Sequence, residues 1–125
     1  MKKIAFLCIH NSCRSQIAEA FGKVYLKDRY ICMSAGTQLK ARINQDAVRI
    51  MKKYYNIDME KEQYPKIYKD IDEPDIIISM GCDVGCPYVG RPIDFDWGIE
   101  DPTGKDDEEF LNVIEKIKEK VLELK

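Results

Sequence analysis

Residues 7–15 read Leu7-Cys8-Ile9-His10-Asn11-Ser12-Cys13-Arg14-Ser15. This stretch joins the end of a short apolar run, residues 3–8, to the start of an amphipathic helical pattern, residues 15–27. A turn from a strand into a helix N-terminus directs backbone N–H groups toward one point and therefore favours an anion there. The stretch thus predicts an anion-binding loop in a protein of alternating strands and helices.

The same alternation continues along the chain. Short apolar runs predict buried strands at residues 3–8, 30–34, 76–80 and, more briefly, 93–97. Apolar residues at helical spacing predict helices at residues 15–27, after an N-cap at Asn44, and after an N-cap at Asp106. The predicted fold class is α/β with three layers, a four-stranded parallel sheet flanked by helices.

Length, charge and cysteine content narrow the class of protein. A chain of 125 residues is expected to form one domain, residues 1–125. Its 20 basic and 22 acidic residues give a net charge of −2, which predicts no general affinity for nucleic acid. No apolar run in the sequence approaches the ~18 residues that a membrane span needs. Five cysteines without an export signal favour reduced thiols, and we expect a cytoplasmic monomer.

Cys8 is the central candidate for chemistry. Ligands of parallel α/β sheets bind at the carboxyl ends of the strands, and Cys8 and Cys82 each stand at the end of a predicted strand. A helix N-terminus stabilises the thiolate form of a cysteine. Arg14 is able to bind two oxygens of a tetrahedral oxyanion, and Ser15 is able to donate a hydrogen bond to the thiolate. The alternative is a small buried cysteine beside a solvent-exposed arginine.

Two further cysteines, Cys82 and Cys86, form a C-x3-C pair between glycines. The glycines let the segment rearrange, and cysteines so close in sequence are able to reach disulfide geometry. One alternative is that both are structural thiols, and another is a four-thiolate zinc site with Cys8 and Cys13. We expect no bound metal, because a strand-to-helix turn suits an anion better.

Asp101, which precedes Pro102 in a predicted loop, is the candidate acid. A carboxyl group beside an anion site can protonate a departing oxygen. An ordinary turn aspartate is the alternative, and Glu100 and Asp106 are competing acids nearby.

Three residues receive lesser roles. His10, the only histidine, is interpreted as a spectator in the loop. Cys13 is interpreted as an accessory thiol that the chemistry does not require. Cys32 lies in the middle of a predicted strand and is assigned to the core.

Three segments taken together resemble one family. They are Cys8-x5-Arg14-Ser15, Ser34-Ala35-Gly36 and Trp97-Gly98-x2-Asp101-Pro102-x-Gly104-Lys105. In this order they resemble the low-molecular-weight protein tyrosine phosphatase superfamily, and within it the thioredoxin-coupled arsenate reductases. The resemblance implies the low-molecular-weight phosphatase fold and an oxyanion held by Ile9, His10, Asn11, Ser12, Cys13 and Arg14. Arsenate is the implied substrate, with phosphate or sulfate as mimics.

The resemblance also implies a reaction sequence. The Cys8 thiolate attacks arsenate while Asp101 protonates the departing hydroxide. Cys82 then attacks Cys8, which releases arsenite, and Cys86 attacks Cys82 in turn. Thioredoxin, or a similar dithiol protein, reduces the final Cys82–Cys86 disulfide. The gap between Cys82 and Cys86 is shorter here than in the best-known reductases of this type.

Two features favour a reductase over a phosphatase. Phosphate ester hydrolysis needs one thiol and an acid, whereas two-electron reduction with turnover needs a second and a third thiol. The family's tyrosine phosphatases usually carry an aromatic residue after the Asp-Pro pair, and this chain has Thr103. A tyrosine phosphatase acting through a Cys8 phosphoenzyme is the second candidate. A non-catalytic oxyanion- or zinc-binding module is the third.

Some relatives bind potassium beside the loop, using groups that match Asn11, Glu19 and Ser34. A fourth ligand in those relatives, an aspartate, falls at or near Lys66 in this chain. The resemblance therefore implies loop support by Asn11, Glu19 and Ser34. We expect no cofactor, with the Lys66 ammonium in place of the ion.

Overall fold

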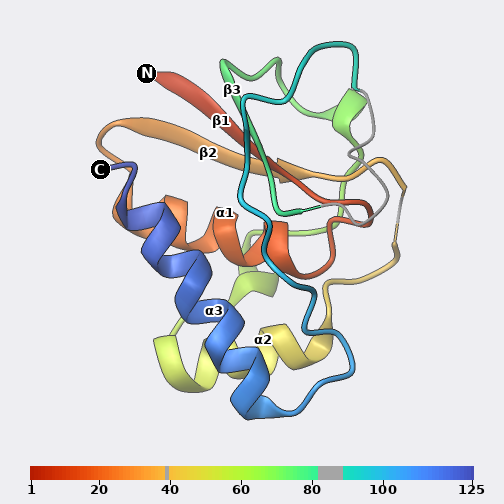
Figure 1. Ribbon diagram of the computed structural model, residues 1–125, viewed down its shortest axis with the longest axis vertical. Helices are drawn as coiled ribbons and strands as arrows, with labels where there is room; N and C mark the ends of the chain where they lie inside the picture. The colour runs from red at the N-terminus through yellow and green to blue at the C-terminus, as the bar shows by residue number, and fades with distance from the viewer. Residues whose placement is uncertain (39, 82–88) are drawn as a thin grey trace.

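The computed structural model describes residues 1–38, 40–81 and 89–125. Its elements are β1 (Lys2–Leu7), α1 (Arg14–Tyr25), β2 (Tyr30–Ala35), α2 (Gln45–Tyr55), η1 (Met59–Lys61), η2 (Tyr68–Asp70), β3 (Ile76–Ser79), β4 (Phe95–Asp96) and α3 (Asp107–Leu122). The strands form one parallel sheet in the order β2-β1-β3-β4 (Figure 1). The predicted four-stranded parallel sheet is confirmed. In the described ranges no helix has the length and apolar character required to cross a membrane.

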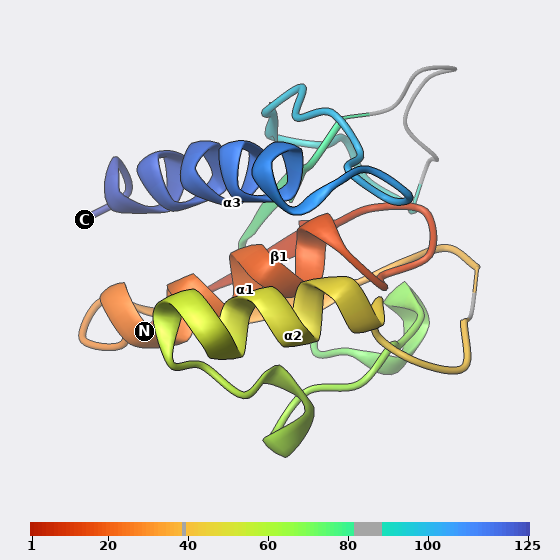
Figure 2. The same ribbon diagram turned by 90° about the horizontal axis from the view of Figure 1, so that it is seen from below.

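The two faces of the sheet are covered unequally. Helices α1, α2 and α3 lie together on one face, with α1 between the other two (Figure 2). The opposite face carries a smaller apolar cluster, formed by Ala5, Leu7, Ala35 and Ile77. Residues from η2 and from the segment 89–93 pack on this cluster. The predicted cover on both faces is confirmed, but its second layer is a single-turn helix and loop rather than a pair of long helices.

The helices begin where their capping residues predict. Asn44 accepts hydrogen bonds from the backbone N–H groups of Asp46 and Ala47, which start α2. Asp106 accepts from the backbone N–H of Glu109 and caps α3. Both predicted N-caps are confirmed.

Near the ends of α1 and α2, the residue that packs inward is one position later than simple helical spacing indicates. Val24 is 47% exposed and Tyr54 is 49% exposed, although each lies at helical spacing from buried apolar residues of its own helix. Tyr25 and Tyr55 pack instead, with ring centroids 6.1 and 5.3 Å from that of Phe21. The Tyr25 and Tyr55 rings thereby gain aromatic contacts with the buried ring of Phe21.

Strand register brings three connections to one edge of the sheet. Leu7, the last residue of β1, pairs with Ala35 of β2 and with Ser79 of β3. Gly36 follows β2 directly, and a Cβ atom added there would lie 2.5 Å from the carbonyl oxygen of Ile9. Only glycine permits this approach, so the end of β2 lies directly against the loop that follows β1.

Candidate active site

A cleft of about 800 Å³ opens at the carboxyl ends of the strands. The predicted nucleophile Cys8, the predicted anion ligand Arg14 and the predicted acid Asp101 all line it. Ile9, His10, Ser12 and Cys13 of the predicted oxyanion loop line it as well. The structure therefore brings together residues that lie up to 93 positions apart.

Asn11, which was expected both to hold substrate and to support the loop, is not among the residues that line the cleft. It is fully buried, and its side chain supports the loop rather than facing the cleft. Its φ angle is +52°, a left-handed conformation that costs a non-glycine residue about 1 kcal/mol. This conformation points the Asn11 backbone N–H at the Cys8 sulfur, 3.2 Å away. The residue thus contributes to the site through its backbone and its buried amide.

Ser15 lies beneath Cys8 on the first turn of α1. Its Oγ is fully buried and lies 2.8 Å from Cys8 Sγ. Together with the Asn11 N–H, the hydroxyl gives the sulfur two hydrogen-bond donors. Two donors at one sulfur stabilise the thiolate, which is the nucleophilic form.

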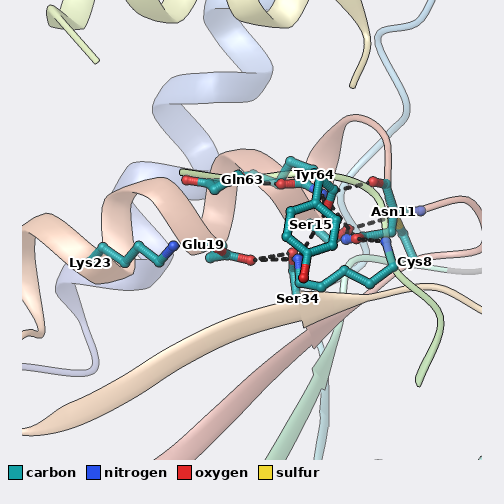
Figure 3. A network of polar contacts seen from close by, with 10 residues as sticks. Cys8, Asn11, Ser15, Glu19, Lys23, Ser34, Gln63 and Tyr64 are labelled. Atoms are coloured by element: carbon teal, nitrogen blue, oxygen red, sulfur yellow. Dashed lines mark hydrogen bonds and ion pairs between the residues drawn. The ribbon is translucent and has the colours of Figure 1, made fainter. Parts of the chain in front are cut away.

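The direction of the Ser15 hydrogen bond is set by a chain of buried amides (Figure 3). Asn11 Oδ1 accepts from the backbone N–H of Lys66 at 3.0 Å and from Gln16 Nε2 at 2.9 Å. Asn11 Nδ2 therefore faces Ser15 and donates to Ser15 Oγ at 2.8 Å. Because a serine hydroxyl has one proton, the Ser15 proton is directed at Cys8.

Gln16 and Gln63 extend this chain, and sequence reasoning missed both. Gln63 Nε2 donates to Gln16 Oε1 at 2.8 Å and to the Gln16 carbonyl at 3.0 Å. Gln16 is fully buried and Gln63 is 8% exposed. The signal for Gln16 is its place directly after Arg14-Ser15, whereas Gln63 lies in a charged segment that carries no comparable signal.

Arg14 connects the loop to the other walls of the cleft. Its Nη1 donates to the carbonyl oxygens of Met80 and Gly81, at 3.5 and 3.4 Å, and to that of Ile99. Gly81 has a φ of +124°, and a Cβ atom there would lie 3.1 Å from the backbone of Gly98. The guanidinium is thereby held at the point where the end of β3 meets the segment 97–101.

The predicted loop-support residues Glu19 and Ser34 form a buried charge cluster with two lysines. Glu19 is 2% exposed and accepts a 2.6 Å hydrogen bond from Ser34 Oγ. Lys23 Nζ lies 2.7 Å from its Oε2, and Lys66 Nζ lies 3.3 Å from its Oε1. Lys66 Nζ also donates to the carbonyl oxygen of Tyr64 at 3.0 Å. The carboxylate oxygens thus already have cationic and hydroxyl donors.

Asp101 lies exposed at the rim of the cleft. Its Oδ1 accepts two hydrogen bonds from Thr103, one from the backbone N–H at 3.0 Å and one from Oγ1 at 2.6 Å. The placement of Asp101 in the cleft with Cys8 is what an acid needs, and its catalytic role stays a prediction.

The other described cysteines are buried. Burial raises the pKa of the Cys13 thiol to about 12, and nearby Asp101 adds to that effect. Burial likewise raises the pKa of Cys32 to about 11, and its side chain belongs to the core as predicted. Both are therefore neutral thiols at physiological pH.

The second and third predicted redox cysteines, Cys82 and Cys86, lie outside the described residues. Within residues 1–38, 40–81 and 89–125, no group of three or more histidine, cysteine or acidic side chains is arranged to hold a metal ion. The four-thiolate zinc alternative includes Cys82 and Cys86, so that finding does not test it.

Comparison with known proteins identifies the family. The family model described as low molecular weight phosphotyrosine protein phosphatase matches residues 3–125. The chain belongs to this family. The resemblance inferred from the three sequence segments is confirmed.

Relatives within the low molecular weight phosphatase family include arsenate reductases. Arsenate reductase 1 of Staphylococcus epidermidis is 38% identical over 121 residues, which cover 94% of this chain and 90% of that protein. A solved structure described as an arsenate reductase in the phosphate binding state has a TM-score of 0.85 at 36% identity, covering 99% of this chain and 96% of that one. A low molecular weight protein tyrosine phosphatase from T. tengcongensis shares the fold, with a TM-score of 0.76 at 23% identity over 99% of this chain and 97% of that one.

Proposed function

We propose that this protein reduces arsenate to arsenite, with Cys8 as the nucleophile. The observation that carries the proposal is the cleft that Cys8, Arg14 and Asp101 line together. It is supported by the 38% identity to a protein named arsenate reductase and by the likeness to an arsenate reductase in its phosphate binding state. A site that binds phosphate suits arsenate, because both are tetrahedral oxyanions.

In the first step the Cys8 thiolate attacks arsenic. The S–As bond forms, an As–O bond breaks, and the departing hydroxide takes a proton from Asp101 and leaves as water. Arsenic keeps its oxidation state here. Ser15 and Asn11 hold the thiolate through the hydrogen bonds described above, and Arg14 balances the charge of the oxyanion.

In the second step Cys82 attacks the sulfur of Cys8. An S–S bond forms, the S–As bond breaks, and its electron pair stays on arsenic, which leaves as arsenite. Cys86 then attacks Cys82 and releases the Cys8 thiolate. Thioredoxin or a similar dithiol protein reduces the resulting Cys82–Cys86 disulfide. In this proposal the protein works as a monomer in the cytosol, where thiols are kept reduced.

We also propose that the Lys66 ammonium serves in place of a potassium ion beside the loop. Support comes from its contacts with Glu19 Oε1 and the Tyr64 carbonyl oxygen, two oxygens suited to a cation. Asn11 Oδ1 already accepts two N–H donors, which leaves it a poor ligand for a metal ion. Residues arranged in this way do not fit potassium.

The proposal is tested by following NADPH consumption with arsenate, thioredoxin and thioredoxin reductase. Turnover that requires both arsenate and thioredoxin is the expected result. The family also contains phosphatases, so hydrolysis of 4-nitrophenyl phosphate is measured in parallel. Efficient hydrolysis of the ester without any arsenate-dependent turnover would establish the phosphatase instead.

A further inference from the structure

We propose that Thr103 positions the acid Asp101. The inference deepens the proposed function, because it rests on Asp101 protonating the departing oxygen. Thr103 itself is a positioning residue, which acts on the reaction through the Asp101 carboxyl group.

The geometry singles out one oxygen of Asp101. The Thr103 backbone N–H and the Thr103 hydroxyl both donate to Oδ1, at 3.0 and 2.6 Å. An oxygen that accepts two donors is a poor place for the acidic proton, since a proton there would face two others. The proton of the acid form is therefore placed on Oδ2. The backbone bond is common in turns after aspartate, but the hydroxyl bond depends on Thr103 itself.

The two Thr103 hydrogen bonds act on the proton-transfer step. As the S–As bond forms and the As–O bond breaks, the Oδ2 proton moves to the leaving oxygen and Asp101 becomes a carboxylate. Hydrogen bonds to a carboxylate are stronger than those to a neutral carboxyl group. The Thr103 bonds therefore strengthen as the reaction proceeds, which raises kcat rather than substrate affinity.

The test is a double-mutant cycle with Asp101. Thr103→Val removes the hydroxyl at nearly constant shape, and Thr103→Ser keeps it. Each is made in the wild type and in Asp101→Asn. We expect Thr103→Val to lower kcat for arsenate roughly 10-fold with KM unchanged. Thr103→Ser should retain most of the wild-type kcat. In the Asp101→Asn background, neither substitution should change kcat further. An equal loss in the Asp101→Asn background, or none in the wild type, would overturn the proposal.

Aryl phosphates separate this inference from the proposed function. Phenolate leaves only with a proton, whereas 4-nitrophenolate leaves readily without one. Thr103→Val is therefore expected to slow hydrolysis of phenyl phosphate more than that of 4-nitrophenyl phosphate, and equal slowing of the two would contradict the inference. This holds even if the wild type reduces no arsenate. If the ratio of the two rates were unchanged in Asp101→Asn, Asp101 would not be the acid, and Thr103 would have no acid to position.

Discussion

Asn11 Nδ2 lies 2.8 Å from Ser15 Oγ and donates a hydrogen bond to it. Because the other end of the Asn11 amide accepts from the Lys66 backbone N–H and from Gln16, the amide cannot turn over without losing both bonds. The Ser15 proton is thereby committed to Cys8 Sγ, 2.8 Å away. A buried amide thus determines the direction of the hydrogen bond between Ser15 and Cys8.

Replacing Ser15 with Ala should slow alkylation of Cys8. The variant removes one of the two donors to the sulfur, and a hydrogen bond to a charged acceptor is worth about 1.5–3 kcal/mol. We expect iodoacetamide to react at pH 7 at least about 10-fold more slowly than with the wild type. Thr37→Ala, which removes a hydroxyl from an exposed neighbouring residue, is the control. Wild-type alkylation of the Ser15→Ala variant would show that the hydroxyl does not act on the sulfur.

Replacing Gln63 with Leu should destabilise the protein and slow the same alkylation. The change leaves Gln16 Oε1 and the Gln16 carbonyl without their buried donor, at a cost of about 1–3 kcal/mol. Denaturant unfolding measures this loss. Gln45→Leu is the matched control, because Gln45 is exposed and its hydrogen bonds to Glu60 and to the Ile43 carbonyl compete with water, so its loss should cost less. Equal losses for the two variants would mean that the buried amide chain adds nothing.

Lys66→Met should reduce stability and leave the protein responsive to potassium. Glu19 would lose one of its two ammonium partners in a buried site, at a cost of roughly 1.5–3 kcal/mol. The wild type should unfold and turn over equally in KCl and NaCl, whereas the variant should be partly rescued by KCl. Lys69→Met, on the exposed side of η2, is the control. A marked gain of the wild type in KCl over NaCl would contradict the proposal.

Much of the fold followed from local patterns. The apolar runs gave the strands, and Asn44 and Asp106 marked the starts of two helices because capping depends on residues close in sequence. The cover of the second sheet face was not predictable in detail, because η2 and residues 89–93 pack there through contacts distant in sequence. Tyr54 and Tyr55 likewise differ in burial because of a ring 34 residues away from Tyr55, that of Phe21.

The residues of the site also differ in whether they could be predicted from local sequence. Cys8, Arg14 and Asp101 were predicted from motif and spacing, and they share the cleft. Gln63 escaped prediction, since its partner Gln16 lies 47 residues away and glutamine in a charged segment usually faces solvent. Asn11 was assigned both to substrate binding and to loop support, and its buried side chain makes contacts that suit the second role. Tertiary contacts, rather than local sequence, decide these roles.

Alkaline pH should destabilise the fold through Cys32. Its pKa rises from 9.0 to about 11 on burial, so the native state holds the proton more tightly than the unfolded state does. The stabilisation is complete below pH 9 and is lost as the pH rises toward 11, by roughly 2 kcal/mol. The free energy of unfolding, measured across this range, should fall less steeply in Cys32→Ala. Parallel pH dependences would exclude Cys32 as the source.

The relay through three cysteines is tested most directly by Cys86→Ser in a single-turnover experiment. The reduced variant is mixed with arsenate in the absence of thioredoxin, and arsenite and disulfides are determined by mass spectrometry. The relay predicts one arsenite per protein molecule, a trapped Cys8–Cys82 disulfide, and no rate comparable to that of the wild type when thioredoxin and its reductase are then added. Absence of that disulfide, or continued arsenite formation equal to that of the thioredoxin-coupled wild type, would contradict it.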